Sequence, residues 1–200
     1  MPVAKKRQRL SVEERRHQLL EVGLEIFSRR GLESVSIGEI ADAAGVSPGL
    51  LYHYFPNKQS LYDAAVERAL IDLEEVMAKA NPTNSLELSD LSRMLTAYVD
   101  FAQTRAREYR FVLVRGAASS EHVRTLIDKM RSSYVDRFAV FAGDTPQFRV
   151  LGFSMIAFFE TSLLAWLEQP QENRMTAEEL TALTVHMAMS ALQYVAHNKA

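Results

Sequence analysis

The chain has 200 residues, of which 48% are apolar and 24% are charged, and these proportions are typical of a soluble globular protein with one large or two small domains. It contains no Cys, which excludes disulfides and Cys-ligated zinc and indicates a reducing compartment, the cytoplasm. The first residues are basic and are followed by charged residues, unlike a signal peptide. The longest uncharged apolar stretch, 150–159, is too short to span a bilayer.

The net charge of −2 is unevenly distributed along the chain. Residues 1–60 carry nine Lys or Arg and seven Asp or Glu, whereas residues 61–200 carry fourteen and eighteen. The first ten residues contain four basic residues and no acidic one, so we expect a basic flexible arm over 1–10. Such an arm either only improves solubility or contacts DNA phosphates or the minor groove.

A first helix is predicted from Val12 to about Arg30. Ser11 and Glu14 form a capping box before it, and Gly31 follows its end. Its apolar residues recur at helical spacing and form one stripe, Leu19, Val22, Gly23, Ile26 and Phe27.

The stretch 36–58, SIGEIADAAGVSPGLLYHYFPNK, is predicted to form two short helices joined by a tight turn. Ser36 and Glu39 form a capping box at the start of the first helix, and Gly45 ends it. Ser47 caps the second helix, where Pro48 occupies the first position. Leu51 and Phe55 are expected to point inward, which leaves an outer face without any charged residue: Gly49, Leu50, His53 and Tyr54.

This outer face has two interpretations. A helix that enters the major groove of DNA needs small residues at its start, donors for phosphates and apolar atoms for thymine methyls, and this face supplies all three. An ordinary helical hairpin, whose Tyr and His side chains pack on neighbours, has the same spacing.

The segment SIGEIADAAGVSPGLLYHYFPNKQSLY resembles the DNA-binding segment of TetR-family transcriptional repressors. The similarity lies in the small-residue–Gly–Val–Ser turn, the Leu-Tyr-x-Tyr-Phe core and the x-Asn-Lys-x-x-Leu entry into the next helix, and it extends from Val12 to Leu61. The rest of the chain matches the family in size and helical character. Leu50 stands where such families often have Thr, and Gly38 where relatives often have a longer side chain, which bears on the operator sequence rather than on binding.

The resemblance implies a set of DNA contacts. Tyr52, Tyr54 and Lys58 match phosphate-contacting positions of the family, Leu50 and His53 are expected at base edges, and Ser36 is expected at a phosphate. The predicted DNA-binding residues are Ser36, Ser47, Gly49, Leu50, Tyr52, His53, Tyr54 and Lys58.

A long helix is predicted from Lys58 to about Ala80, capped by Asn57 and ended by the Asn-Pro-Thr-Asn sequence at 81–84. Since it leads from the helical pair into the rest of the chain, we expect it to couple the two parts. Helical spacing continues to the C-terminus, and no stretch shows sustained period-two alternation. The sequence therefore predicts an all-α fold with a helix-turn-helix domain over 1–56, a connecting helix over 57–80, and a ligand-binding and dimerisation domain over 81–200.

The last two predicted helices differ from the others. Residues 146–168 are apolar on nearly every side of a helix, and a helix of this kind needs cover on every side. Either both helices complete the core of a monomer, or they form a four-helix bundle with a second copy, as the resemblance implies. We expect the dimer, with an interface of Phe158, Ser162, Leu163, Trp166, Met187, Ala188 and Ala191.

The sequence shows no catalytic motif, no cofactor motif and no His pair spaced for a metal. Glu160 stands alone among apolar residues. It either anchors a cationic or hydroxylated ligand, or pairs with an Arg such as Arg115 or Arg149, or reaches solvent. Aromatic and Met residues on the inward stripes of 81–200 belong either to a core or to the lining of an apolar cavity. The candidates for such a lining are Tyr98, Phe101, Phe111, Met130, Tyr134 and Phe159.

Together these features predict a homodimeric transcriptional repressor that binds a palindromic operator and is released by a small, largely apolar or aromatic effector. An enzyme and a structural or division-control protein that binds DNA without an inducer are the alternatives. The absence of a paired catalytic constellation counts against the enzyme.

Overall fold

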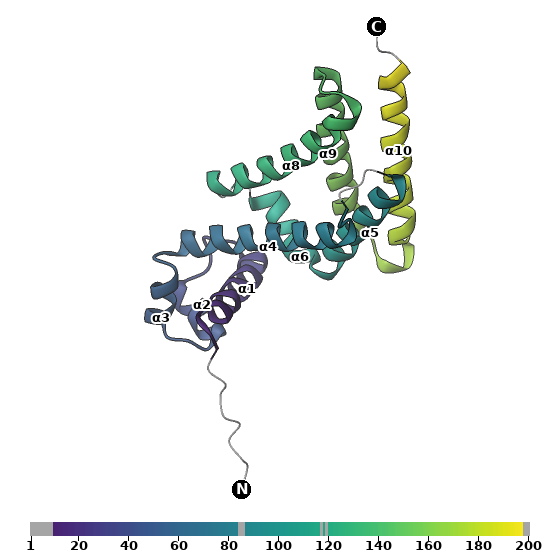
Figure 1. The fold of residues 1–200 in the computed structure, drawn as a ribbon. Helices are drawn as coiled ribbons and strands as arrows, with labels where there is room; N and C mark the ends of the chain where they lie inside the picture. The colour runs from purple at the N-terminus through teal and green to yellow at the C-terminus, as the bar shows by residue number, and fades with distance from the viewer. Residues whose placement is uncertain (1–9, 84–86, 117, 119, 198–200) are drawn as a thin grey trace. The chain divides into compact units, whose positions relative to one another are not determined.

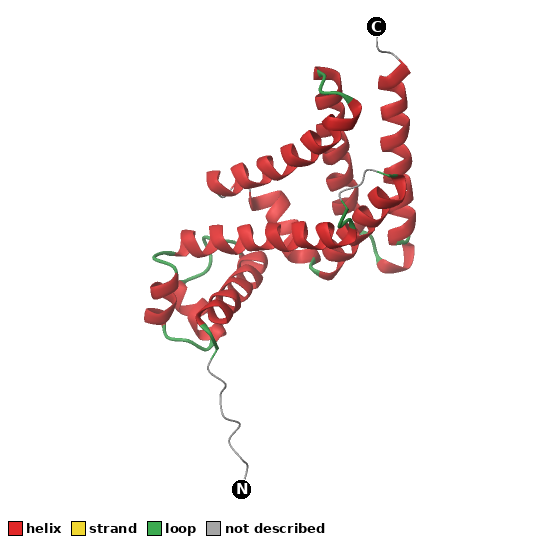
Figure 2. Cartoon of the chain, viewed as in Figure 1, coloured by secondary structure: helices red, strands yellow, loops and turns green. Residues whose placement is uncertain are grey.

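The computed structural model describes residues 10–83, 87–116, 118 and 120–197, and within these ranges it contains helices and loops but no strand (Figure 2). The predicted all-α fold is confirmed. The chain divides into two compact units, of which the first ends at Arg68 and the second begins at Ala69. This division lies inside a helix, between the predicted limits at 56 and 80. Apart from Leu10, the predicted basic arm lies outside the described residues.

The first unit contains α1 (Val12–Arg30), α2 (Ile37–Ala44), α3 (Pro48–Tyr54) and the first half of α4 (Lys58–Ala80) (Figure 1). Both predicted capping boxes are present, at the starts of α1 and α2. The side-chain oxygen of Asn57 accepts a hydrogen bond from the N–H of Ser60 at 2.8 Å, which caps α4 as predicted. Local sequence signals therefore determine where these helices begin.

The core of the first unit joins α1 to α2, α3 and α4. Phe27, Ile40, Leu51 and Leu61 are buried completely. The methyl carbons of Leu61 lie within 3.5 Å of the position that a Cβ atom would take on Gly23, so α1 and α4 approach closely where this glycine lies. Apolar burial of this kind, at roughly 1.5–3 kcal/mol per large side chain, is what holds the short helices in place.

The second unit is a helical bundle. Beyond the end of α4 it contains α5 (Leu88–Thr104), α6 (Ala106–Phe111), a π-helical turn (Val112–Gly116), α8 (Glu121–Ala142), α9 (Pro146–Glu168), a short 3₁₀ turn (Gln171–Asn173) and α10 (Ala177–His197). α5 packs against α10, and α9 packs against both α8 and α10 (Figure 1). Val135 and Ala139 of α8 form a cluster with Phe148 of α9. A Cβ on Gly152 would lie 3.1 Å from a methyl of Val135, so the bare glycine permits close contact between α8 and α9.

Helix α9 has 23 residues, a mean hydropathy of 1.7 over its most apolar window, and no more than two charged residues there. By length and composition alone it could cross a membrane, because its apolar pattern continues beyond Arg149 and Glu160, the charges that bound the uncharged stretch 150–159. Both charges are paired, α9 packs against two other helices of its unit, and 28% of its most apolar window is buried there.

Candidate nucleic-acid interface and apolar cavity

Helices α2 and α3 are joined by a turn that depends on Gly45. This residue has φ 66° and ψ 35°, a left-handed conformation that costs a residue without Cβ very little. The N–H of Val46 then donates to the carbonyl of Ala41 at 3.0 Å. Leu51 and Phe55 are both buried and anchor α3, as predicted.

The outer face of α3 is exposed and carries no charge. Leu50 is 37% exposed and Tyr52 is 52% exposed, although both are large and mainly apolar. Gly49 and His53 are also exposed, whereas Tyr54 is half-buried and its ring meets the His53 ring edge-on, with centroids 5.6 Å apart. Exposed apolar and aromatic side chains of this kind, grouped on one short helix, are typical of a contact surface.

The two capping serines differ in what they can offer to a phosphate. The hydroxyl of Ser36 accepts from the N–H of Glu39 at 3.2 Å and donates to its carboxylate at 2.9 Å. Because a hydroxyl has one donor and phosphate oxygens only accept, Ser36 would have to release Glu39 before it could bind a phosphate. The hydroxyl of Ser47 accepts from the N–H of Leu50 at 3.2 Å, a bond that leaves its own proton available.

An ion pair lies beside the start of α2. An Nη atom of Arg30 lies 2.5 Å from the carboxylate of Glu39. The backbone N–H of Ser36 and then this guanidinium lower the pKa of Glu39 to about 2. The charged carboxylate therefore fixes the capping box at neutral pH and ties the end of α1 to the start of α2.

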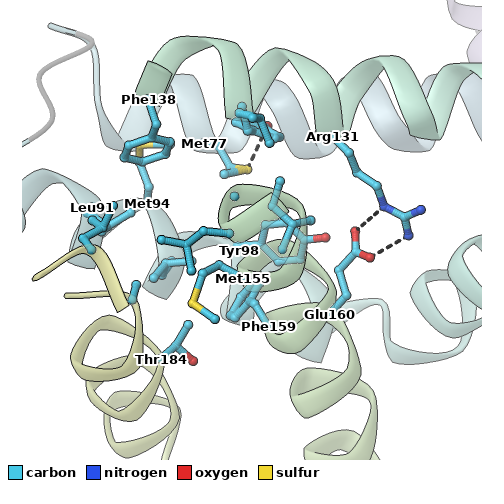
Figure 3. Close-up of a pocket in the computed structure, with 18 of the residues that line it drawn as sticks. Met77, Leu91, Met94, Tyr98, Arg131, Phe138, Met155, Phe159, Glu160 and Thr184 are labelled. Carbon is cyan, nitrogen blue, oxygen red and sulfur yellow. Dashed lines mark hydrogen bonds and ion pairs between the residues drawn. The ribbon is translucent and has the colours of Figure 1, made fainter. Parts of the chain in front are cut away.

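The second unit contains an apolar cavity of about 160 Å³ among α5, α8, α9, α10 and the end of α4. Its wall is almost entirely carbon and sulfur, and four of the six predicted lining residues contribute to it: Tyr98, Met130, Tyr134 and Phe159. The edge of the Tyr98 ring meets the Phe159 ring with centroids 5.0 Å apart. Figure 3 shows these aromatic rings beside the thioether of Met155.

The other two predicted residues lie elsewhere. Phe101 lines a smaller cavity of about 20 Å³ near Leu70 and Tyr109. Phe111 is buried at the end of α6 and does not belong to the lining of either cavity. Both residues are aromatic and lie on apolar stripes, as cavity-lining residues do. Helical spacing alone, however, does not distinguish a position that lines a cavity from one that packs against other side chains.

Glu160 lies at the edge of the larger cavity and pairs with Arg131 (Figure 3). The guanidinium donates through Nη2 to Oε2 at 2.6 Å and through Nε to Oε1 at 3.2 Å. The predicted pairing of Glu160 with an Arg is confirmed, but the partner is Arg131: Arg149 binds Asp144 and Asp136 instead, and the side chain of Arg115 lies outside those described. The bidentate pair joins α8 to α9.

Tyr98 and Tyr134 of the larger cavity, and Tyr109 of the smaller one, have phenols whose pKa is raised. The hydroxyl of Tyr109 donates to that of Tyr98 at 3.2 Å, and burial raises the pKa of both phenols. Burial, and then the charge of Glu74, raises the pKa of Tyr134 to about 12, while its hydroxyl donates to the sulfur of Met77 at 3.2 Å. These hydroxyls can therefore donate hydrogen bonds but do not ionise under ordinary conditions.

The predicted dimer residues fall into two groups. Leu163 is fully buried and Trp166 is 3% exposed within a single chain, where the indole N–H donates to the carbonyl of Met175 at 2.7 Å. These two residues are already covered and are removed from the predicted interface. Phe158, Ser162, Ala188 and Ala191 are half-buried and Met187 is exposed, although Ala188 also lines the larger cavity.

Several lining residues escaped the sequence analysis. Met77, Met94, Phe138 and Met155 line the cavity but are absent from the predicted lining. The sequence feature that could have revealed them is that Met and Phe recur on the apolar stripes of several helices. Arg131 gave no local signal, because it lies 29 residues from Glu160 along the chain.

A helix-turn-helix with an uncharged outer face and a separate helical unit with an apolar cavity define the class of helical DNA-binding regulators. No cluster of three or more His, Asp or Glu side chains that could hold a metal occurs in the described part of the chain. The family model for bacterial regulatory proteins of the TetR family matches residues 19–65, and the model for the tetracyclin repressor-like C-terminal domain matches residues 87–191. The chain therefore belongs to the TetR family of DNA-binding transcriptional regulators, which confirms the resemblance.

Individual relatives agree with this assignment. A TetR-family regulator from Streptomyces coelicolor is 34% identical, and its crystal structure superposes with a TM-score of 0.74 over 93% of this chain and 83% of that one. The transcriptional activator FasR of Mycolicibacterium smegmatis is 27% identical over 192 residues, which are 94% of this chain and 87% of FasR. The transcriptional repressor KstR of Mycobacterium tuberculosis is 31% identical over 124 residues, 58% of this chain and 56% of KstR. Both named relatives are regulators rather than enzymes.

Proposed function

We propose that this protein is a cytoplasmic transcriptional repressor that binds a palindromic operator as a homodimer and is released by a small, largely apolar or aromatic effector. The observation that carries the proposal is that one chain combines an exposed, uncharged helix α3 in its first unit with a partly open apolar cavity in its second unit. An empty cavity of about 160 Å³ with an almost purely apolar wall destabilises the fold, because the atoms that line it lose dispersion contacts. A bound ligand would restore these contacts.

In this proposal, the DNA contacts divide into two kinds. Lys58, Tyr52 and Ser47 bind phosphates, which supplies affinity without sequence preference. Leu50 and His53 reach base edges, where an apolar side chain contacts thymine methyls and an imidazole can donate or accept. Gly49 leaves the start of α3 without a side chain, which allows a close approach to DNA. Protein packing does not require this glycine, because a Cβ there would meet only the hydroxyl of Ser47, at 4.0 Å.

Dimerisation is proposed through α9 and α10, each of which has an exposed stripe of small or apolar side chains. On α9 the stripe is Ser154, Ala157, Thr161 and Ala165, with the half-buried Phe158 and Ser162 beside it. On α10 it is Ala182, Leu183, His186, Met187 and Ser190, with Ala191 half-buried. Small side chains allow close helix contact, so two copies can form a four-helix bundle. A two-fold dimer then presents two α3 helices to half-sites about 34 Å apart, and the operator is an inverted repeat.

Release follows from a shift between two states of the dimer. One state of the dimer fits the operator and the other does not. An effector that binds the second state more tightly lowers DNA affinity. The free energy of this coupling equals the difference in effector affinity between the two states, typically about 1–3 kcal/mol. Helix α4 contributes residues to both units, Met77 of the cavity wall among them, and is the proposed carrier of the coupling.

The test uses the purified full chain. Selection of bound fragments from random DNA is expected to yield an inverted repeat, and footprinting is expected to show protection of both half-sites. Compounds that raise the melting temperature in a screen of apolar metabolites are then added to the complex. Release by these compounds, but not by screen compounds without a thermal shift, supports the proposal. Tight DNA binding that no cavity ligand affects would instead identify a DNA-binding protein without an inducer, the structural or division-control alternative.

Activation of transcription is a second candidate, because FasR, which is similar over 94% of this chain, is named an activator. A reporter with the selected operator overlapping a promoter, compared with one carrying it upstream of the promoter, separates the two. A repressor lowers expression from the overlapping site, and an activator raises expression from the upstream site.

A further inference from the structure

One end of the large cavity carries charges, and the rest of its wall does not. Glu160 and Arg131 lie at that end, while Leu91, Met94 and Phe138 lie at the other (Figure 3). A ligand that fills the cavity therefore has one end beside the ion pair. The charge of the ligand group at that end determines whether Glu160 and Arg131 remain bound to each other.

The two members of the pair are not equally free to leave it. The side chain of Glu160 is 9% exposed, whereas that of Arg131 is 30% exposed. Arg131 also lies 3.7 Å from the carboxylate of Asp128, so it keeps a partner when it moves away from Glu160. A ligand that took Arg131 for itself would leave a buried carboxylate without a counter-charge, which is strongly unfavourable.

The surroundings of the pair favour positive charge as well. A surface depression on the same pair is lined by Asp128, Arg131, Ser132, Phe153, Glu160 and Thr161, with Ala157, so its charged groups are two carboxylates and one guanidinium. Inside the cavity, the rings of Tyr98 and Phe159 lie next to Glu160, and aromatic faces attract cations. A cation is thus favoured on both sides of the carboxylate.

We propose that the effector carries a cationic group, an amine or a quaternary ammonium, on an apolar or aromatic body, and that this group binds Glu160 in place of the guanidinium of Arg131. The inference rests on the proposed function, because it names the ligand class of the same cavity. The volume of about 160 Å³ resembles that of an apolar cavity of about 150 Å³ that holds benzene, so a phenyl ring on a short chain is a suitable body.

The experiment compares three probes that share one body and differ in charge: phenylbutylamine, phenylbutanol and phenylbutanoate. Their dissociation constants for the full chain are measured by titration calorimetry at neutral pH. The amine is expected to bind most tightly and the carboxylate most weakly, with a difference of about tenfold or more between them. The alcohol reports on the apolar cavity alone.

Two substitutions locate the charge preference. Glu160→Gln should remove the advantage of the amine over the alcohol and leave the alcohol unchanged. Arg131→Gln should tighten amine binding, because the ligand then supplies the counter-charge that Glu160 lacks. Glu168→Gln, an exposed position on the same helix, serves as the matched control and should change none of the three affinities. If Glu160→Gln fails to fold, the Arg131→Gln result decides alone.

Tighter binding of the carboxylate than of the amine, or equal binding of all three probes, would overturn this inference and leave the proposed ligand cavity in place. Amine binding that Arg131→Gln does not strengthen would also overturn it. If none of the probes binds, both the charge preference and the cavity as a binding site are rejected.

Discussion

The rings of Phe27 and Tyr62 meet edge-on, with centroids 5.5 Å apart and planes inclined by 75°. This contact joins α1 to α4, and both side chains are fully buried. Edge-to-face pairs of this kind contribute about 0.5–1.5 kcal/mol beyond the area they bury. The pair therefore stabilises the unit that presents α3.

Replacing Phe27 with Ala is expected to destabilise the first unit by about 3–5 kcal/mol, because the change removes a buried ring and leaves a cavity. Denaturant unfolding followed by circular dichroism measures the loss. Val12→Ala, at a position of the same helix that is 68% exposed, is the control and should change the free energy of unfolding by less than about 0.5 kcal/mol. Equal effects of the two changes would contradict the packing described for α1.

Lys58→Ala is expected to weaken binding to specific and random DNA alike, because the lysine is proposed to contact a phosphate. Each lost phosphate contact should reduce the slope of log affinity against log salt by about 0.9. Fluorescence anisotropy at several salt concentrations measures this slope. Lys79→Ala, an exposed position at the other end of α4, should leave the slope unchanged. A normal slope for Lys58→Ala would remove that residue from the interface.

Leu183→Glu and Met187→Glu place a charge on the exposed stripe of α10, at side chains that are each about two-fifths exposed in the single chain. Both should yield monomers, since burying an unpaired carboxylate in an apolar interface costs several kcal/mol. Light scattering after size-exclusion chromatography measures the mass. Val140→Glu, on the exposed side of α8, is the comparison variant and should remain dimeric. Dimers of all three variants would place the interface elsewhere.

Acid is expected to destabilise the first unit through Glu39, whose folded-state pKa of about 2 lies below its ordinary value of 4.5. A carboxyl with a lowered pKa contributes stability above its unfolded pKa, and this contribution is lost as the pH falls from about 4.5 to about 2. In Glu39→Gln, the melting temperature should therefore depend less on pH across this window than in the parent chain. A parallel pH dependence of the two proteins would show that Glu39 is not a stabilising charge.

Local signals in the sequence determined most of the helix boundaries, including those of α3. Capping boxes such as Ser36 with Glu39, and a glycine in a left-handed turn at Gly45, act over three or four residues, and the structure forms them where they were predicted. The TetR family could also be recognised, because its DNA-binding segment is a short run of residues at fixed spacing.

Only the tertiary structure decided which apolar stripes meet a cavity, which pack, and which stay exposed. Phe111 and Tyr98 look alike in the sequence, yet only Tyr98 lines the large cavity, and Leu163 is buried where a dimer surface was expected. The pairing of Arg131 with Glu160 was equally hidden. The physical reason is that such contacts depend on how whole helices pack side by side, and helical periodicity specifies the buried side of a helix but not its neighbour.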